Sequence, residues 1–124
     1  MISNNAIEIK IEDGVVLGIF LDGASIDFNV AKDCIRIRLL LQDKKIMPLL
    51  LDIRNLKELS KPARDLLASS EGLKAISAGA LLTDKSFFLH TLGSIFFRLS
   101  KPKIPHKMFH DRKQAIAWLK KFKK

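Results

Sequence analysis

The sequence is poor in the features that build disulfide frameworks and membrane spans. It contains a single cysteine, Cys34, which cannot form a disulfide within the chain and therefore favours a reducing compartment. Cys34 has apolar neighbours at helical spacing, so we expect a buried structural thiol rather than a reactive one. No stretch reaches the roughly 20 apolar residues that cross a bilayer, and the first residues do not read as a secretory signal. These absences predict a cytoplasmic protein.

Motifs for catalysis and cofactor binding are also missing. There is no GxSxG elbow, glycine-rich phosphate loop, HExxH motif or cysteine pair. His106 and His110 are four residues apart and would suit the start of a metal site, but no cysteine is near them and Asp111 is better placed as a helix cap. We therefore expect a protein that is not an enzyme and that has no catalytic residues, metal or cofactor.

Acidic side chains are almost absent from the end of the chain. Residues 1–97 hold 12 basic and 12 acidic side chains, whereas residues 98–124 hold 10 basic ones against Asp111 alone, so the net charge of +9 belongs to this last segment. A localised positive field attracts nucleic acid or anionic lipid. Against nucleic acid, Trp118 and Phe122 fall on the apolar side of the last predicted helix, where bases could not stack on them. A solvated lysine face is the alternative meaning of the segment.

What the sequence does contain is an alternation of strand and helix patterns. Apolar segments on either side of Asp13 and Gly14 predict an opening hairpin. The expected strands are 6–12, 15–21, 46–53, 73–82 and 106–109, and the expected helices begin at Asp27, Ser60, Ser86 and Asp111, the second ending at Gly72. The order is β-β-α-β-α-β-α-β-α. It predicts one α/β domain over residues 1–124, with a mixed, mostly parallel sheet and right-handed crossovers.

Two of these segments, LLLDIRN and KPKIPHKMFHDRKQAIAWL, resemble a bacterial STAS-like domain (sulfate transporter and anti-sigma factor antagonist) of the small stand-alone SpoIIAA-like branch. The matching positions are Asp52, Ile53, Arg54, Phe109, Asp111, Ala115, Trp118 and Leu119. The resemblance covers nearly the whole chain. It implies a SpoIIAA-like fold and a non-enzymatic role, typically the binding of a partner.

The best-known members of that family carry a phosphorylatable serine soon after the aspartate that ends the strand. Here Asp52 is followed by no serine until Ser60, which we interpret as a helix N-cap, with a phosphorylation site as the alternative. Asp52 ends a predicted strand at the edge where open α/β sheets place ligand crevices. Asp52, Arg54 and Ser60 therefore mark a candidate ligand crevice, and an ion pair between Asp52 and Arg54 is the structural alternative.

The segment that follows Lys85 has more apolar side chains than one helix face buries. Helical spacing gives a core stripe made of Phe88, Leu89, Leu92, Ile95, Phe96 and Leu99. Phe87 and Phe97 fall outside that stripe and form a second line with His90 and Ser94. Exposed apolar patches tend to mark interfaces, so we predict a partner-binding surface at this line. Cover by neighbouring elements of the same chain is the alternative.

These observations favour a regulatory or scaffolding module that acts through protein–protein contacts. A homodimer is the simplest partnership, since the same surface on two copies can close on itself. The second hypothesis is the binding of nucleic acid or an anionic lipid surface through the basic C-terminal segment. Contact of the second line with an apolar ligand or a membrane surface is a third, because Lys101 and Lys103 flank it.

Overall fold

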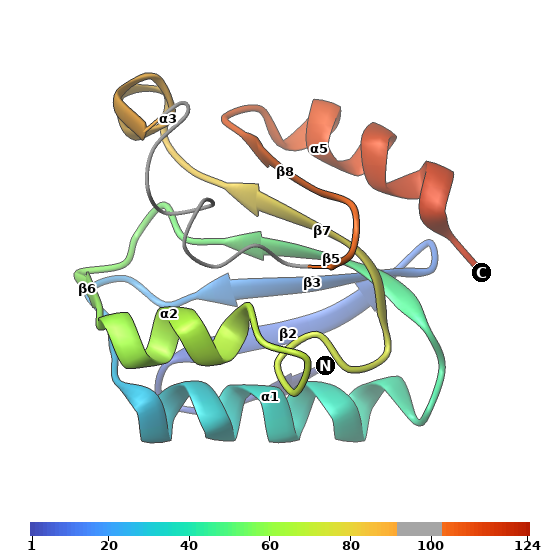
Figure 1. Cartoon of the computed structure of the whole chain (residues 1–124), viewed down its shortest axis with the longest axis horizontal. Coiled ribbons are helices and arrows are strands. Elements are labelled where there is room, and N and C mark those ends of the chain that lie inside the picture. Colours follow the sequence, from blue (N-terminus) through green and yellow to red (C-terminus); the bar gives the residue numbers. More distant parts are fainter. Residues whose placement is uncertain (92–102) are drawn as a thin grey trace.

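A six-stranded sheet forms the centre of the protein (Figure 1). The computed structural model describes the backbone of residues 1–91 and 103–124, and the side chains of residues 1–88 and 103–124. In spatial order the strands are β1 (Ile2–Ser3), β2 (Ile7–Glu12), β3 (Val15–Phe20), β5 (Met47–Asp52), β7 (Ile76–Leu82) and β8 (His106–Phe109). The β1–β2 and β2–β3 pairs are antiparallel, and the other three pairs are parallel. The predicted fold class is therefore confirmed, with its opening hairpin and mostly parallel sheet.

Helices cover both faces of this sheet (Figure 1). α1 (Phe28–Gln42) and α2 (Lys61–Leu67) lie on one face, and α5 (Arg112–Leu119) with the short helix η1 (Lys120–Phe122) lies on the other. α3 (Lys85–Thr91) follows β7. Two short strands, β4 (Ser25–Ile26) and β6 (Glu58–Leu59), pair in parallel beside the main sheet. The sequence patterns predicted neither of them, nor β1.

The three predicted N-caps that the structure describes are confirmed. The Asp27 carboxylate accepts a hydrogen bond from the Val30 amide at 2.9 Å, and the Ser60 hydroxyl accepts one from Ala63 at 3.2 Å. Asp111 accepts from the amides of Lys113 and Gln114 at 2.8 and 3.2 Å. Each cap satisfies helix amides that have no partner inside the helix, which is why these helices begin where the polar residues stand.

The alternation of side chains along the strands gives each face its own core. On the face covered by α1 and α2, strand residues such as Ile9 and Phe20 pack with Ala31 and Ala63. On the face covered by α5, Leu50 packs with Ala115 and Leu119 and their neighbours. Ala78 and Ala80 of β7 lie in this second core, where their small side chains leave room for α5.

The predicted end of the second helix is wrong. α2 ends at Leu67 with its C-cap at Ala68, and turns follow as far as Ala75, whose φ of 64° is left-handed. β7 therefore begins at Ile76 rather than at residue 73. Gly72 does not stop the helix but packs against it, since a Cβ there would lie 2.2 Å from the Leu66 carbonyl oxygen.

A buried polar cluster ties α1 to these turns. Arg38, at the C-terminal half of α1, donates hydrogen bonds to the carbonyl oxygens of Gly72 at 3.0 Å and Lys74 at 3.1 Å, and to the Gln42 side chain. Gln42 in turn donates to the carbonyl of Ala75 at 2.9 Å. Burial lowers the pKa of Arg38 to about 10, so the guanidinium stays charged near neutral pH. The cluster explains how a stretch without regular structure is held in place.

The segment from Ser86 onward is only partly described. The predicted third helix begins at Lys85, and its continuation beyond residue 91, including Ser94 and Phe97, lies outside the described residues. Within the described ranges, no helix has the length and apolar character needed to cross a bilayer.

Candidate functional site

The carboxyl ends of β5 and β7 border a hollow that we call the rim hollow. Its volume is about 310 Å³. The residues that line it come from the segment after β5, from β6, from α2, from the connection between β7 and α3, and from α3 itself. They are Ile53, Arg54, Leu56, Lys57, Glu58, Leu59, Arg64, Thr83, Asp84 and Phe87. This edge of a parallel sheet is where open α/β proteins place their binding crevices.

Arg54 is the residue of the rim hollow whose position the structure explains best. The carboxylate of Asp52, which is only 5% exposed, accepts hydrogen bonds from the Arg54 backbone amide at 3.0 Å, from Nε at 3.0 Å and from Nη2 at 2.8 Å. These hydrogen bonds raise the pKa of Arg54. The Arg54 side chain nevertheless remains 45% exposed. Asp52 therefore orients a cation that still faces outward, and the ion pair expected as the structural alternative is observed.

Ser60 lies apart from this arrangement. Its hydroxyl caps α2, and it is not among the residues that line the rim hollow. Asp52 does not line the hollow either, because its carboxylate is turned toward Arg54. Of the three predicted crevice residues, only Arg54 reaches the hollow.

Phe87 was predicted as part of the partner-binding line, and it lies at the same hollow as Arg54 of the predicted ligand crevice. It lines the rim hollow and keeps 40% of its surface exposed, and its amide donates to the Asp84 carboxylate at 2.7 Å. His90 belongs to α3, but its side chain lies outside the described residues, as do Ser94 and Phe97. The partner-binding line is therefore described at Phe87 alone.

Two further cations of the hollow were missed by the sequence analysis. Lys57 precedes β6 and Arg64 lies in α2, so neither belongs to a local motif. They approach Arg54 because β6 pairs with β4 and draws this segment against the sheet edge. No signal in the sequence alone marks that convergence.

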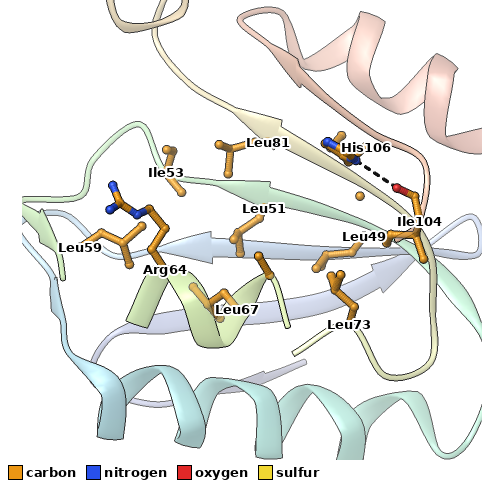
Figure 2. Close-up of a pocket in the computed structure, with 13 residues that line it drawn as sticks. Leu49, Leu51, Ile53, Leu59, Arg64, Leu67, Leu73, Leu81, Ile104 and His106 are labelled. Atoms are coloured by element: carbon orange, nitrogen blue, oxygen red, sulfur yellow. Dashed lines mark hydrogen bonds between the residues drawn. The ribbon is translucent and has the colours of Figure 1, made fainter. Parts of the chain in front are cut away.

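An almost wholly apolar cavity adjoins the rim hollow, and we call it the apolar cavity. Its volume is about 100 Å³. Figure 2 shows Leu49 and Leu51 from β5 facing this space, with Leu67 from α2 and Leu73 from the turns on its other side. Near its far end, His106 Nδ1 lies 3.0 Å from the Ile104 carbonyl oxygen, so Nδ1 carries the proton of that hydrogen bond.

The basic C-terminal segment packs against the opening hairpin. Arg112 lies 3.9 Å from Glu12, and Lys120 lies 3.6 Å from Asp13. Acidic residues distant in sequence thus offset part of its charge. Trp118 packs between Phe109 and Phe122, with ring centroids 5.7 and 4.9 Å away. This agrees with the prediction that these aromatic rings face the packed side of the helix.

The histidines do not assemble a metal site in the part of the chain that the structure describes. No group of three or more His, Cys, Asp or Glu side chains that could hold a metal ion occurs there. His110 instead stacks edge-on against Phe88, with ring centroids 4.8 Å apart.

The strand order and the helices on both faces define an α/β protein with a SpoIIAA-like fold. A solved structure with that fold, an uncharacterized DUF3478-family protein from Shewanella loihica PV-4, is similar to this chain with a TM-score of 0.60 and 20% identity, covering 96% of this chain and 98% of that one. Residues 9–123 match the model of a family described as a domain of unknown function, DUF7793, and the chain belongs to that family. No curated protein matches it. The expected SpoIIAA-like fold is thereby confirmed.

Proposed function

We propose that this protein is a non-enzymatic regulatory or scaffolding module that binds a partner protein at the rim hollow. The observation that carries the proposal is the pairing of a partly exposed aromatic ring, Phe87, with an oriented and partly exposed cation, Arg54, in one hollow. Aromatic and arginine side chains contribute a large share of the energy at protein interfaces.

The polar groups of the hollow support binding rather than catalysis. The Asp84 carboxylate accepts the amide of Phe87, and the Thr83 hydroxyl donates to the Asp84 carbonyl at 3.0 Å. The remaining charged residues are Arg54, Lys57, Glu58 and Arg64. Among these lining residues there is no nucleophile held by a neighbouring base, which is the arrangement that covalent catalysis uses.

A pair of phenylalanine variants tests the proposal. Phe87 and Phe28 are 40% and 43% exposed, and Phe28 lies at the start of α1, away from the hollow. Lysate of the native host is passed over wild type, Phe87→Glu and Phe28→Glu, and retained proteins are compared by quantitative mass spectrometry. We expect Phe87→Glu to lose a retained partner about tenfold or more while Phe28→Glu keeps it. A partner retained equally by both variants would contradict the proposal.

Self-association is the simplest form of this proposal. Sedimentation velocity over a range of protein concentrations measures it directly. We expect a dimer of wild type and of Phe28→Glu, and a monomer of Phe87→Glu with an unchanged melting temperature. A wild-type monomer at every concentration would direct the proposal to a partner other than a second copy.

The exposed lysines of the C-terminal segment favour a second candidate function, the binding of an anionic polymer or lipid surface. Lys113 and Lys121 are exposed and make no ion pair with the acidic residues that the structure describes, unlike Arg112 and Lys120. A gel shift with duplex DNA across a salt series, and flotation with anionic vesicles, test it. We expect binding that weakens with salt and is reduced by Lys113→Glu but not by Lys57→Glu. No retention at low salt in either assay removes this candidate.

A further inference from the structure

The outward side of α5 and η1 carries lysines and no acidic side chain. Four exposed residues define it, and we call it the basic face: Lys113, Ala117, Lys120 and Lys121. Their spacing of four, seven and eight residues from Lys113 places them on one side of a helix. Ala115 and Leu119 on the opposite side are fully buried in the core, and they fix the direction in which the lysines point.

Positive charge remains in surplus here after the neighbouring acidic residues are counted. Residues 112–124 contain six basic and no acidic side chains. The acidic residues brought to this segment are Asp111, which caps α5, and Glu12 and Asp13 of the β2–β3 hairpin. Lys10, which pairs with Glu12 at 3.2 Å, adds one more basic side chain. Seven positive charges therefore stand against three negative ones, and such a surplus attracts a polyanion.

The side chains of α5 and η1 favour duplex nucleic acid over other polyanions. Trp118 packs between Phe109 and Phe122, so neither Trp118 nor Phe122 is presented to the bases of a single strand. Among the exposed residues of α5 and η1, no apolar side chain is larger than Ala117, whereas a helix that lies in a membrane surface inserts large apolar residues. The phosphates of a duplex need only cations, because they are contacted from outside without readout of the bases.

The lysines form a row that suits a rod-shaped polyanion. Lys113 and Lys121 are eight residues apart, which is about 12 Å along a helix axis. Duplex DNA carries one phosphate charge per about 1.7 Å of its axis, so a row of this length faces several phosphates. Glu12 and Asp13, which we call the acidic turn, lie beside the row at the end of the β2–β3 hairpin (Figure 1). A duplex can follow the row without meeting these carboxylates, whereas a flat anionic surface would meet both.

The acidic turn is in contact with two cations of the segment. Arg112 lies 3.9 Å from Glu12, and Lys120 lies 3.6 Å from Asp13. The side chains of Glu12 and Asp13 are 55% and 77% exposed, and exposed pairs of this kind are weak. A phosphate is therefore able to replace either carboxylate.

We propose that the basic face binds the phosphate backbone of duplex DNA without regard to sequence, and that the acidic turn lowers the affinity by competing with phosphates for Arg112 and Lys120. This inference rests on the second candidate function, because it names the polyanion, and a control of its binding, at the same surface.

A pair of double variants separates the acidic turn from net charge. The turn variant, Glu12→Gln/Asp13→Asn, removes two negative charges beside the basic face, and asparagine tolerates the left-handed backbone of Asp13, where φ is 52°. The charge control, Asp43→Asn/Glu71→Gln, removes two negative charges at exposed positions beside α1, on the other face of the sheet. Asp43 has a matching φ of 50°.

A second pair tests the basic face itself. Lys113→Gln/Lys121→Gln removes two lysines that make no ion pair with the acidic residues that the structure describes. Its control, Lys32→Gln/Lys45→Gln, removes two exposed lysines from α1 and from the turn that follows it.

Fluorescence anisotropy with duplexes of unrelated sequence, over a series of salt concentrations, measures the affinity of the full-length protein. We expect similar affinities for all sequences. Lys113→Gln/Lys121→Gln should weaken binding about tenfold at low salt and reduce the slope of log K against log salt by about 2, whereas its control should bind nearly as wild type does. The turn variant should bind about fivefold more tightly than the charge control. Vesicles that contain phosphatidylserine should not retain the protein at the salt concentration at which the duplex is bound.

The outcomes separate this inference from the function on which it rests. A protein that binds the vesicles but not the duplex would keep the second candidate function and reject the inference, and binding of neither would reject both. Equal affinities of the turn variant and the charge control would show that only net charge matters and would remove the competing role of the acidic turn. Equal affinities of the two lysine variants would place the DNA site away from the basic face.

Discussion

Two arginines of this protein show opposite uses of the same side chain. Arg38 is 4% exposed and donates to the backbone carbonyls of Gly72 and Lys74 and to the side-chain oxygen of Gln42, without a carboxylate partner among the described residues. Arg54 is 45% exposed and is held by the buried carboxylate of Asp52. The first guanidinium is enclosed by the chain, and the second is held in place but presented outward.

This difference separates a cation that the chain uses to hold its own segments together from one that it presents at the surface. A buried guanidinium is tolerated when neutral acceptors take up its hydrogen bonds, and it then fixes the segments that supply them. A half-exposed guanidinium on a buried carboxylate has lost part of its rotamer freedom before any partner arrives, so less conformational entropy is lost on binding. We therefore expect Arg38 to act on stability and Asp52 to act on the orientation of Arg54.

The largest expected effect is on Arg38. Arg38→Met keeps the apolar stem but leaves the Gly72 and Lys74 carbonyls without their donor, and we expect the free energy of unfolding to fall by about 3 kcal/mol. Urea denaturation measures it. The control is Arg36→Met, which removes an exposed ion pair with Asp33 and should leave the free energy of unfolding nearly unchanged. Equal costs for the two variants would mean that relief of a buried charge offsets the lost hydrogen bonds.

The next effect concerns Asp52. In Asp52→Asn the amide nitrogen would face the donors of Arg54, so one acceptor is lost and two donors meet. We expect a loss of about 2 kcal/mol in the free energy of unfolding, and faster solvent exchange of the Arg54 Nε proton by NMR. Asp65→Asn, which breaks the exposed pair with Lys61, should cost about 0.5 kcal/mol. An unchanged exchange rate of the Nε proton would show that Asp52 does not hold Arg54.

The fold was predictable because its signals are local. Asp27, Ser60 and Asp111 stand before apolar periodicity, and each caps a helix in the structure. The end of α2 was not predictable. Glycine often follows the end of a helix, so Gly72 was predicted to stop the helix. Here glycine is needed because the turns bring residue 72 close to the Leu66 carbonyl, and that approach depends on how the turns fold back.

The candidate site was predictable only in part, for a related physical reason. Arg54 follows a strand end, and Phe87 falls outside a helical stripe, so each has a local pattern. Lys57 and Arg64 look like ordinary surface cations until the pairing of β4 with β6 brings them to the same hollow. When segments distant in sequence meet in the fold, no local pattern of residues marks the meeting point. Lys57 and Arg64 could therefore not be assigned to the hollow from the sequence.

The smallest expected effect concerns Cys34, which lies one turn before Arg38 in α1. It tests how well the packed side of α1 excludes solvent. Burial raises the pKa of the Cys34 thiol from 9.0 to about 11. Between these values the unfolded chain binds fewer protons than the folded one, so the free energy of unfolding falls as pH rises, by about 1 kcal/mol at pH 10 relative to pH 8. Urea denaturation at both values should show this loss in wild type and a smaller one in Cys34→Ala, which cannot ionise there. Equal losses in the two proteins would mean that solvent reaches Cys34, and that the side of α1 that carries Arg38 is less enclosed than Arg38's hydrogen bonds imply.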